Sequence, residues 1–394
     1  MKELKAIVTA FRATDYSIRK AALATVVRVH GSSYRSPGAR MLITDDGKWT
    51  GSISGGCLEG DALRKARQVM IDGKPLTVTY DTREESNQNL GIGLGCNGVI
   101  DVLIEPIEPS SPHNPILLFE KIISRNEPVL LATACKGKST GCKLLMDEFK
   151  QILFNTFNQD ITGLITEDLS ALTNNRASRI ETYTDTDVFL ELIQPAISLI
   201  IFGGGFDARP VSELAKTLGW SVQITDECVA HIAPVFFPTA DRLSLCQREF
   251  IERDFSITNY TACILMSHNY EYDRDVLKKL LKTKTPYIGM LGPRKRFEKM
   301  LDEFEKEGLT LNADDLHRIH SPIGLDIGAE TPDEIAVSII AEIQSKFTNR
   351  SGGFLKYRSS PIHQRDTNSD QIFKQVFLED AQGVKPSKLK TSGR

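Results

Sequence analysis

Residues 197–220, ISLIIFGGGFDARPVSELAKTLGW, place a continuous apolar run directly before three glycines and an amphipathic segment. A strand that is buried on both faces has such a composition, and glycines let the chain turn tightly from a strand into a helix. The alternation continues downstream, where further strands are expected at SVQITD, TACILMS and PYIGML. A final helix is expected to begin at Thr331, with Glu334 completing a capping box. This order predicts a doubly wound parallel sheet over residues 197–350.

The three glycines also fit a nucleotide-binding pattern. Gly203, Gly205 and Ala208 match the form G-x-G-x-x-A, and Asp226 ends the next expected strand. In a Rossmann-like domain such glycines let the backbone approach a pyrophosphate, and the acidic residue accepts a hydrogen bond from a ribose hydroxyl. The same glycines would also serve a tight turn without a ligand. The pattern therefore predicts the fold and leaves NAD(P) binding open.

Two other strand ends carry polar residues. His268 follows TACILMS, and LGPRKR (291–296) places Arg294 at the expected start of a helix. Cations there oppose the helix dipole, and a bound anion would resolve this conflict. Because such strand ends meet at one edge of a doubly wound sheet, we expect an anion site beside the glycines. A solvated basic turn and a structural histidine are the alternatives.

Residues 1–155 show a mixed pattern that predicts a separate α+β domain. An amphipathic helix is expected near the start and a helix is expected after Cys57, while Asp46-Gly47 predicts a hairpin turn. Residues 156–196 are polar and weakly periodic, so we expect a connecting arm between the two domains. Residues 351–394 contain few aliphatic side chains and are expected to form a polar tail.

Glycines frame two cysteines of the amino-terminal domain. GSISGGCLEG (51–60) places Cys57 directly after Gly55 and Gly56, and GLGCNG (93–98) places Cys96 after Gly95. A thiol near a helix start has a lowered pKa because the dipole and free N–H groups favour the thiolate, and glycines leave room for a ligand. The spacing of a structural zinc site is absent. The alternative is that each cysteine is a small buried hydrophobic residue.

A basic turn precedes this region. GSSYRSPGARM (31–41) places Arg35 and Arg40 on either side of a Pro-Gly turn that also carries serines. Arginines and the main chain of such a turn are suited to phosphate or carboxylate. A loop arginine in water is the alternative.

Composition limits the classes of partner. The chain of 394 residues has a formal net charge of −3, which provides no long-range attraction to nucleic acid or to an anionic membrane. No apolar window is long enough to span a membrane, and no secretion signal is seen. We therefore expect a cytoplasmic protein whose seven cysteines are reduced.

Together these motifs, with HNYEYDRDVL and SPIGLDIGAETPDEIAVSI, resemble the XdhC/CoxI family of xanthine dehydrogenase accessory factors. The resemblance covers about residues 1–110 and 197–345. It implies a cofactor-insertion chaperone that binds molybdenum cofactor (molybdopterin), supports its sulfuration by a cysteine desulfurase, and delivers it to the apoenzyme of a molybdenum hydroxylase. It implies a Rossmann-type carboxyl-terminal domain, and Cys57 becomes a candidate ligand of molybdenum. The positions matching the family's motifs are Arg35, Arg40, Gly55, Gly56, Cys57, Glu59, Gly95, Cys96, Gly203, Gly205, Asp226, His268 and Arg294.

Two other functions compete with this one. An NAD(P)-dependent oxidoreductase would use the glycine fingerprint and Asp226, but it would leave the cysteine motifs idle and offers no acid–base dyad beyond His268. A scaffold that only docks partners leaves the anion-site features unexplained. The sequence leaves a homodimer open.

Overall fold

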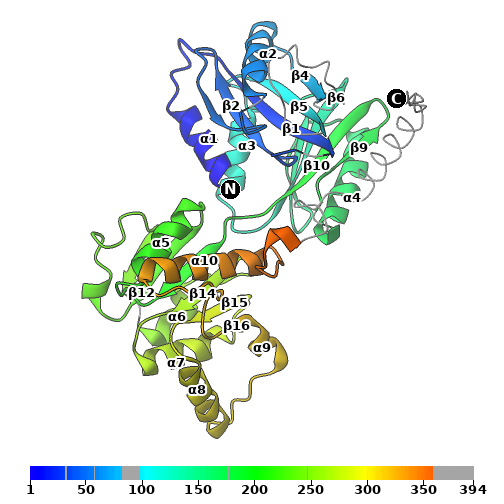
Figure 1. Ribbon diagram of the computed structural model, residues 1–394. Coiled ribbons are helices and arrows are strands. Elements are labelled where there is room, and N and C mark those ends of the chain that lie inside the picture. Colours follow the sequence, from blue (N-terminus) through cyan, green and yellow to red (C-terminus); the bar gives the residue numbers. More distant parts are fainter. Residues whose placement is uncertain (32, 57, 82–97, 176, 246, 358–394) are drawn as a thin grey trace, which may run out of the picture. The chain divides into compact units, whose positions relative to one another are not determined.

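A computed structural model describes residues 1–31, 33–56, 58–81, 98–175, 177–245 and 247–357 (Figure 1). The chain divides into two compact units between Gln194 and Pro195, and the first two residues, Met1 and Lys2, belong to the second unit. We call the two units the amino-terminal and the carboxyl-terminal unit and describe each by itself. The sequence-based prediction of a mixed α+β part followed by a doubly wound parallel sheet is confirmed.

The first sheet of the amino-terminal unit is antiparallel and has the order β3-β2-β1-β5-β4. Its strands are β1 (Ala21–Gly31), β2 (Arg40–Thr44), β3 (Trp49–Gly51), β4 (Leu76–Asp81) and β5 (Gly98–Ile107). Helix α1 (Lys2–Arg12) precedes β1, and α2 (Glu59–Asp72) lies between β3 and β4. Alanines of α2 are buried against β1, β2 and β5, because small side chains let the helix approach the sheet closely. The predicted hairpin turn at Asp46-Gly47 is confirmed between β2 and β3.

A second antiparallel sheet follows in the same unit, with the order β8-β7-β6-β10-β9. Its strands are β6 (Val129–Gly137), β7 (Lys143–Asp147), β8 (Ile152–Asn155), β9 (Arg179–Tyr183) and β10 (Thr186–Ile193). Helix α3 (Pro115–Ile123) precedes β6 in the chain, and α4 (Gln159–Asn175), between β8 and β9, packs on this sheet. Residues 156–196 therefore do not form the expected connecting arm, because they supply α4, β9 and β10 to this sheet. The composition was misleading since α4 buries only one face, through Ile165, Leu169 and Leu172.

The carboxyl-terminal unit contains one sheet whose six strands are all parallel, in the order β13-β12-β11-β14-β15-β16. The strands are β11 (Ser198–Phe202), β12 (Ser221–Asp226), β13 (Arg242–Leu245), β14 (Thr261–Leu265), β15 (Tyr287–Met290) and β16 (Ile319–His320). The helices are α5 (Ala208–Thr217), α6 (Ile251–Asp254), α7 (Tyr270–Leu280), α8 (Arg294–Lys306), α9 (Ala313–Arg318) and α10 (Pro332–Phe347), and the short turns are η2 (Val229–His231), η3 (Arg248–Phe250) and η4 (Leu355–Tyr357). The capping box of Thr331 and Glu334 begins α10 as predicted.

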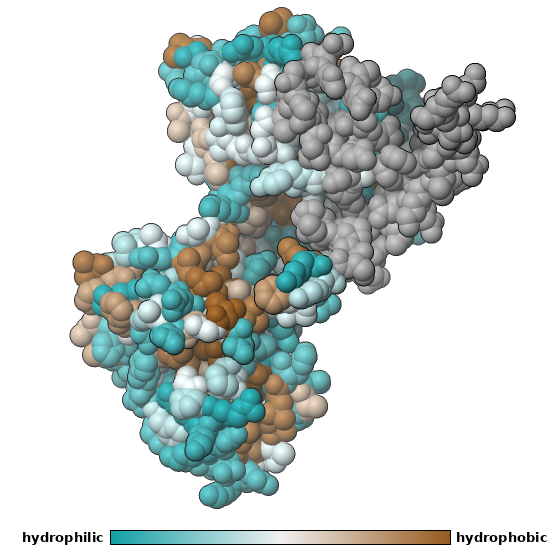
Figure 2. Space-filling view, in the orientation of Figure 1, coloured by the Kyte–Doolittle hydropathy of each residue, from teal (hydrophilic) through white to brown (hydrophobic). Residues whose placement is uncertain are grey.

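Helices cover both faces of this sheet. Leu199 and Ile201 of β11 share a core with residues of α5 and α10, whereas Ile200 and Phe202 share a core with residues of α7 and α8. Figure 2 shows hydrophobic side chains gathered over the region of α5 and α10 on the face in view. Because β11 is apolar on both faces, the central strand requires helices on both sides, as the sequence predicted.

Candidate functional site

The carboxylate of Glu59 organises the chain that surrounds it. Its Oε1 accepts hydrogen bonds from the Ser52 hydroxyl and from the backbone N–H groups of residues 53, 54 and 55, at 2.8–3.2 Å. Its Oε2 accepts from the Ser54 hydroxyl and from the N–H groups of Gly56, at 2.9 Å, and Leu58, at 3.2 Å. We call residues 52–56 and 58 the Glu59 loop. The loop forms a cradle of anion donors, and the chain's own carboxylate fills it.

Glu59 is buried, with 3% of its surface exposed. Burial alone would raise the pKa of its carboxyl, but the hydroxyls of Ser54 and Ser52 and the backbone N–H of Ser54 outweigh burial and lower this pKa to about 2. Glu59 was expected to bind the cofactor directly. The structure instead gives it the task of fixing the loop that precedes α2.

The two glycines of this loop do different things. Gly55 has φ +98°, and a Cβ at this position would lie 2.8 Å from the ring of Tyr34, so Gly55 makes room for a side chain of the protein itself. Gly56 has φ +119°, and a Cβ there would meet no atom of the described residues within 4 Å. Gly56 is therefore exposed backbone beside open space. The predicted site residues Cys57, Gly95 and Cys96 lie outside the described residues.

The two arginines of the preceding turn are not equivalent. Arg35 is partly exposed and forms an ion pair with Glu3, while its Nε is buried without a hydrogen-bond partner among the described residues. Arg40 is buried in an ion pair with Glu191, donates to the carbonyl of Gly38 at 2.8 Å, and lies over the ring of Phe119. Arg40 is thus closed off from solvent, whereas Arg35 keeps an unused donor.

At the carboxyl edge of the parallel sheet, the glycine loop is closed by contacts within the chain. Gly203 has φ +121°, and a Cβ there would lie 2.5 Å from the backbone of Met266, so the close approach of β11 to β14 requires glycine. The N–H of Gly204 donates to Oδ2 of Asp226 at 2.8 Å. Asp226 also contacts Nδ1 of His231 at 3.0 Å and accepts from the N–H of Cys228 at 2.8 Å. Both oxygens of the residue expected to bind a ribose are therefore engaged.

Gly205 and His268 come together at this edge, as the sequence predicted for these two strand ends. A Cβ at Gly205 would lie 3.7 Å from the imidazole of His268. His268 has φ +60°, an unusual backbone conformation for a residue with a side chain, and its Nε2 lies 3.2 Å from Oδ2 of Asp207. The imidazole is more than half exposed. A strained, exposed histidine beside a glycine loop is typical of a ligand-contacting position.

Arg294 is the first residue of α8 and is exposed. It forms no ion pair within the described parts of the chain, whereas Arg296, two residues on, donates to the buried Asp273 at 2.7 Å. Burial raises the pKa of Asp273 despite the hydroxyl of Ser267 and the charge of Arg296. Arg296 is therefore structural, whereas the exposed Arg294 is a cation of this turn that is available to an anion.

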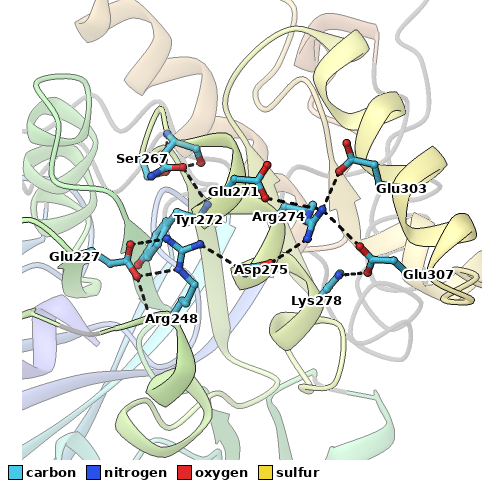
Figure 3. A network of polar contacts seen from close by, with 11 residues as sticks. Glu227, Arg248, Ser267, Glu271, Tyr272, Arg274, Asp275, Lys278, Glu303 and Glu307 are labelled. Atoms are coloured by element: carbon cyan, nitrogen blue, oxygen red, sulfur yellow. Dashed lines mark hydrogen bonds and ion pairs between the residues drawn. The ribbon is translucent and has the colours of Figure 1, made fainter.

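A polar network lies next to Asp226 (Figure 3). Arg248 donates to both carboxylate oxygens of Glu227, at 2.9 and 2.8 Å, and to Asp275 at 3.1 Å. Arg274 continues the network to Glu303. Sequence reasoning missed this network and the contacts of Tyr34 and Asp207. Tyr34, Asp207 and Arg274 lie within the quoted motifs, but a motif does not show which residues its side chains contact. The network joins the end of β12 to α7 and α8.

The described parts of the chain have three further properties, which concern metal sites, free thiols and membrane-spanning helices. They contain no group of three or more histidine, cysteine or acidic residues that is arranged to hold a metal ion. Cys135, Cys142, Cys228 and Cys263 are free thiols. Within the same described ranges, every helix is too short or too polar to cross a membrane.

Comparisons with known proteins agree with this two-part arrangement. Residues 17–81 match the model of the XdhC and CoxI family, and residues 199–343 match that of the XdhC Rossmann domain. A Bacillus subtilis (strain 168) protein, named as a probable xanthine dehydrogenase subunit, is 32% identical over 326 residues, which are 82% of this chain and 92% of that protein. The Escherichia coli (strain K12) "Molybdenum cofactor insertion chaperone PaoD" is 22% identical over 325 residues, 82% of this chain and 83% of that one. The crystal structure of a xanthine dehydrogenase from Bacillus halodurans has a TM-score of 0.71 at 27% identity and covers 92% of this chain and 98% of its own.

Proposed function

The chain belongs to the XdhC and CoxI family, and from this premise we propose that it is a maturation factor that carries molybdenum cofactor as cargo. In this role it binds the cofactor, protects it while a cysteine desulfurase sulfurates it, and hands it to the apoenzyme of a xanthine dehydrogenase-type hydroxylase in the cytoplasm. The names of two relatives, one a molybdenum cofactor insertion chaperone and the other a probable xanthine dehydrogenase subunit, support this assignment.

The observation that carries the proposal is the Glu59 loop. Seven hydrogen bonds to one carboxylate fix a turn whose exposed Gly56 has open space beside it and is followed directly by Cys57. The cargo fits this arrangement through its soft metal centre, for which thiolate is a suitable ligand. Because Glu59 already uses the N–H groups of the loop, these groups are not free to bind an anion. What we propose for the cargo is the space beside Gly56 and the thiol of Cys57, the next residue in the sequence.

Anionic parts of the cargo need donors from elsewhere. The unpartnered Nε of Arg35 is one candidate donor in the amino-terminal unit. In the carboxyl-terminal unit, the exposed Arg294 at the start of α8 and the backbone of Gly205 beside His268 suit a phosphate. We leave Arg40 and Glu59 out of the proposed ligand set because both are buried and fully engaged.

The alternative, an NAD(P)-dependent oxidoreductase, is less well supported by the geometry. The carboxylate that would accept a ribose hydroxyl is Asp226, and it is held by Gly204, His231 and Cys228. A Cβ at Gly204 would lie 2.6 Å from the carbonyl oxygen of His231, so η2 occupies the space beside this glycine. A dinucleotide would have to displace these contacts before it could bind.

The two functions can be separated by titration. Molybdenum cofactor, released anaerobically from a donor enzyme, is added to the purified protein, and NADH and NADPH are added separately. Fluorescence anisotropy of each ligand reports binding. The proposal predicts saturable binding of the pterin and none of NADH or NADPH. Saturable binding of a reduced nicotinamide without binding of the pterin would support the oxidoreductase instead.

A further inference from the structure

The two sheets of the amino-terminal unit repeat one architecture. In each sheet the third strand in sequence lies at one edge, a helix follows it, and the last two strands complete the other side, which gives the corresponding orders β3-β2-β1-β5-β4 and β8-β7-β6-β10-β9. We call residues 21–107 the first repeat and residues 129–193 the second repeat. The repeat is visible in the sequence once the strands are aligned, because LAT (23–25) corresponds to LAT (131–133) and DVLIEPI (101–107) corresponds to DVFLELI (187–193).

Strand register matches the two repeats residue by residue. In the first repeat, Arg40 pairs with Thr25, and Glu105 pairs with the residue two positions before that threonine. In the second repeat, Lys143 pairs with Thr133, and Glu191 pairs with the residue two positions before that threonine. Arg40 therefore corresponds to Lys143, and Glu105 corresponds to Glu191.

Two buried ion pairs connect the repeats reciprocally. Arg40 of the first repeat pairs with Glu191 of the second, and Lys143 of the second repeat pairs with Glu105 of the first. The side chains are similarly buried, at 5% and 5% exposure in the former pair and 5% and 7% in the latter. Each cation also donates to the carbonyl of the glycine two residues before it. The pairs are equivalent in register, in the glycine contact and in burial, and Arg40 differs in lying over the ring of Phe119. Each pair therefore serves as a control for the other.

The segment after each cation differs between the repeats. The carbonyl of Arg40 accepts a hydrogen bond from the N–H of Ser52, the first residue of the Glu59 loop. The carbonyl of Lys143 accepts from the N–H of Thr156, which leads within three residues into α4. The same backbone position therefore supports the candidate loop in one repeat and an ordinary helix in the other.

We propose that Glu191 of the second repeat is a positioning residue for the Glu59 loop of the first repeat. Its carboxylate holds the Arg40 side chain, and this fixes the strand end whose carbonyl anchors Ser52. The second repeat thus supports the candidate site from outside the residues that carry the motif. The consequence for cargo binding rests on the proposed function, whereas the consequence for the loop does not.

The test compares Glu191→Gln with Glu105→Gln in the full-length chain. Hydrogen exchange of the amides of residues 54–56, which donate to Glu59, reports the loop, and pterin affinity reports the site. Glu191→Gln should speed this exchange by about tenfold or more, the scale of losing a charged hydrogen bond, and should weaken pterin binding. Glu105→Gln should lower overall stability similarly while leaving both readouts near those of the wild type.

A third variant keeps the test decisive if Glu191→Gln fails to fold. Arg40→Lys gives the first repeat the kind of cation that the second repeat uses to pair with Glu105, so it should fold and keep most of the protection of the loop. Equal exchange in the loop of Glu191→Gln and Glu105→Gln, or unchanged exchange in both, would overturn the proposal. If wild-type protein binds no pterin while the exchange contrast holds, the proposed function fails and the positioning role stands.

Discussion

Replacing Glu59 by glutamine tests whether an internal anion holds the loop before α2. The side chain keeps its size and one acceptor oxygen, but its new NH2 group faces hydroxyl and N–H donors that the carboxylate satisfied. The fall in the pKa of Glu59 from 4.5 to about 2 corresponds to about 3 kcal/mol of stabilisation of the charged form. Glu59→Gln should therefore lower the free energy of unfolding of the amino-terminal unit by about 3 kcal/mol.

The same carboxylate predicts a pH dependence with a definite sign. Because folding lowers the pKa of Glu59, its contribution to stability is fully present above about pH 4.5 and is lost as the pH falls towards about 2. Between about pH 4.5 and 2 the wild-type protein should lose the stabilisation that the charged Glu59 provides. Glu59→Gln lacks this stabilisation at every pH. The stabilities of the two proteins should therefore converge at low pH.

Urea titration with pulsed hydrogen exchange of peptides from α2 measures this unit separately from the other one. Glu148→Gln, at an exposed glutamate in the turn between β7 and β8, controls for the loss of one negative charge. A loss in Glu59→Gln no larger than that of Glu148→Gln would refute the reasoning. A difference between wild type and Glu59→Gln that stays constant from pH 6 to pH 2 would also refute it.

Three further predictions concern the carboxyl-terminal unit and the buried thiols. Arg294→Ala should weaken the binding of an anionic ligand by about 1.5–3 kcal/mol in titrations. Its melting temperature should be unchanged or slightly raised, since the substitution removes a cation from the positive end of α8. A lowered melting temperature with normal affinity would contradict this prediction. Gly204→Ala should cost about 1–3 kcal/mol in denaturant titrations because its Cβ would crowd the carbonyl of His231, and a neutral effect would show that η2 moves freely. Burial raises the pKa values of the Cys135 and Cys263 thiols to about 12. A thiol reagent at pH 8 should therefore leave both unmodified in the folded protein while it labels the exposed Cys228. Mass spectrometry that finds Cys135 or Cys263 labelled before unfolding would contradict this.

The parallel sheet was predictable because its signals are local. The apolar run of β11, the glycines after it and the capping box of α10 each determine a short stretch of backbone, and all are found where the sequence placed them. The second antiparallel sheet was not predicted. Its helix α4 buries one face only, and β6, one of the two partners of β10, lies more than forty residues earlier in the chain, so no local pattern indicated that pairing.

The roles of site residues were harder to predict than helices and strands. A motif shows which functional groups are present, but it does not show which groups of the folded chain they contact. Glu59 was recognised as an acidic residue near a glycine turn, but only the folded loop shows that its carboxylate serves the backbone around it. Arg40 looked like a ligand donor, and its partner Glu191 lies 151 positions away in the chain. Asp226 fits a nucleotide fingerprint, yet its oxygens are taken by the chain itself.

The most direct test of the proposed function is the cofactor content of protein purified from a host that makes molybdenum cofactor. The test compares wild-type protein with Cys57→Ser and with a control, Cys228→Ser, at an exposed cysteine of the carboxyl-terminal unit. Each protein is oxidised, and its pterin fluorescence is normalised to the amount of protein. We expect pterin in the wild type and in Cys228→Ser, and at least about a tenfold loss in Cys57→Ser, the scale on which a metal site responds to loss of a supporting group. Wild-type protein without pterin, or pterin retained equally in both variants, would contradict a cargo carrier that binds through Cys57.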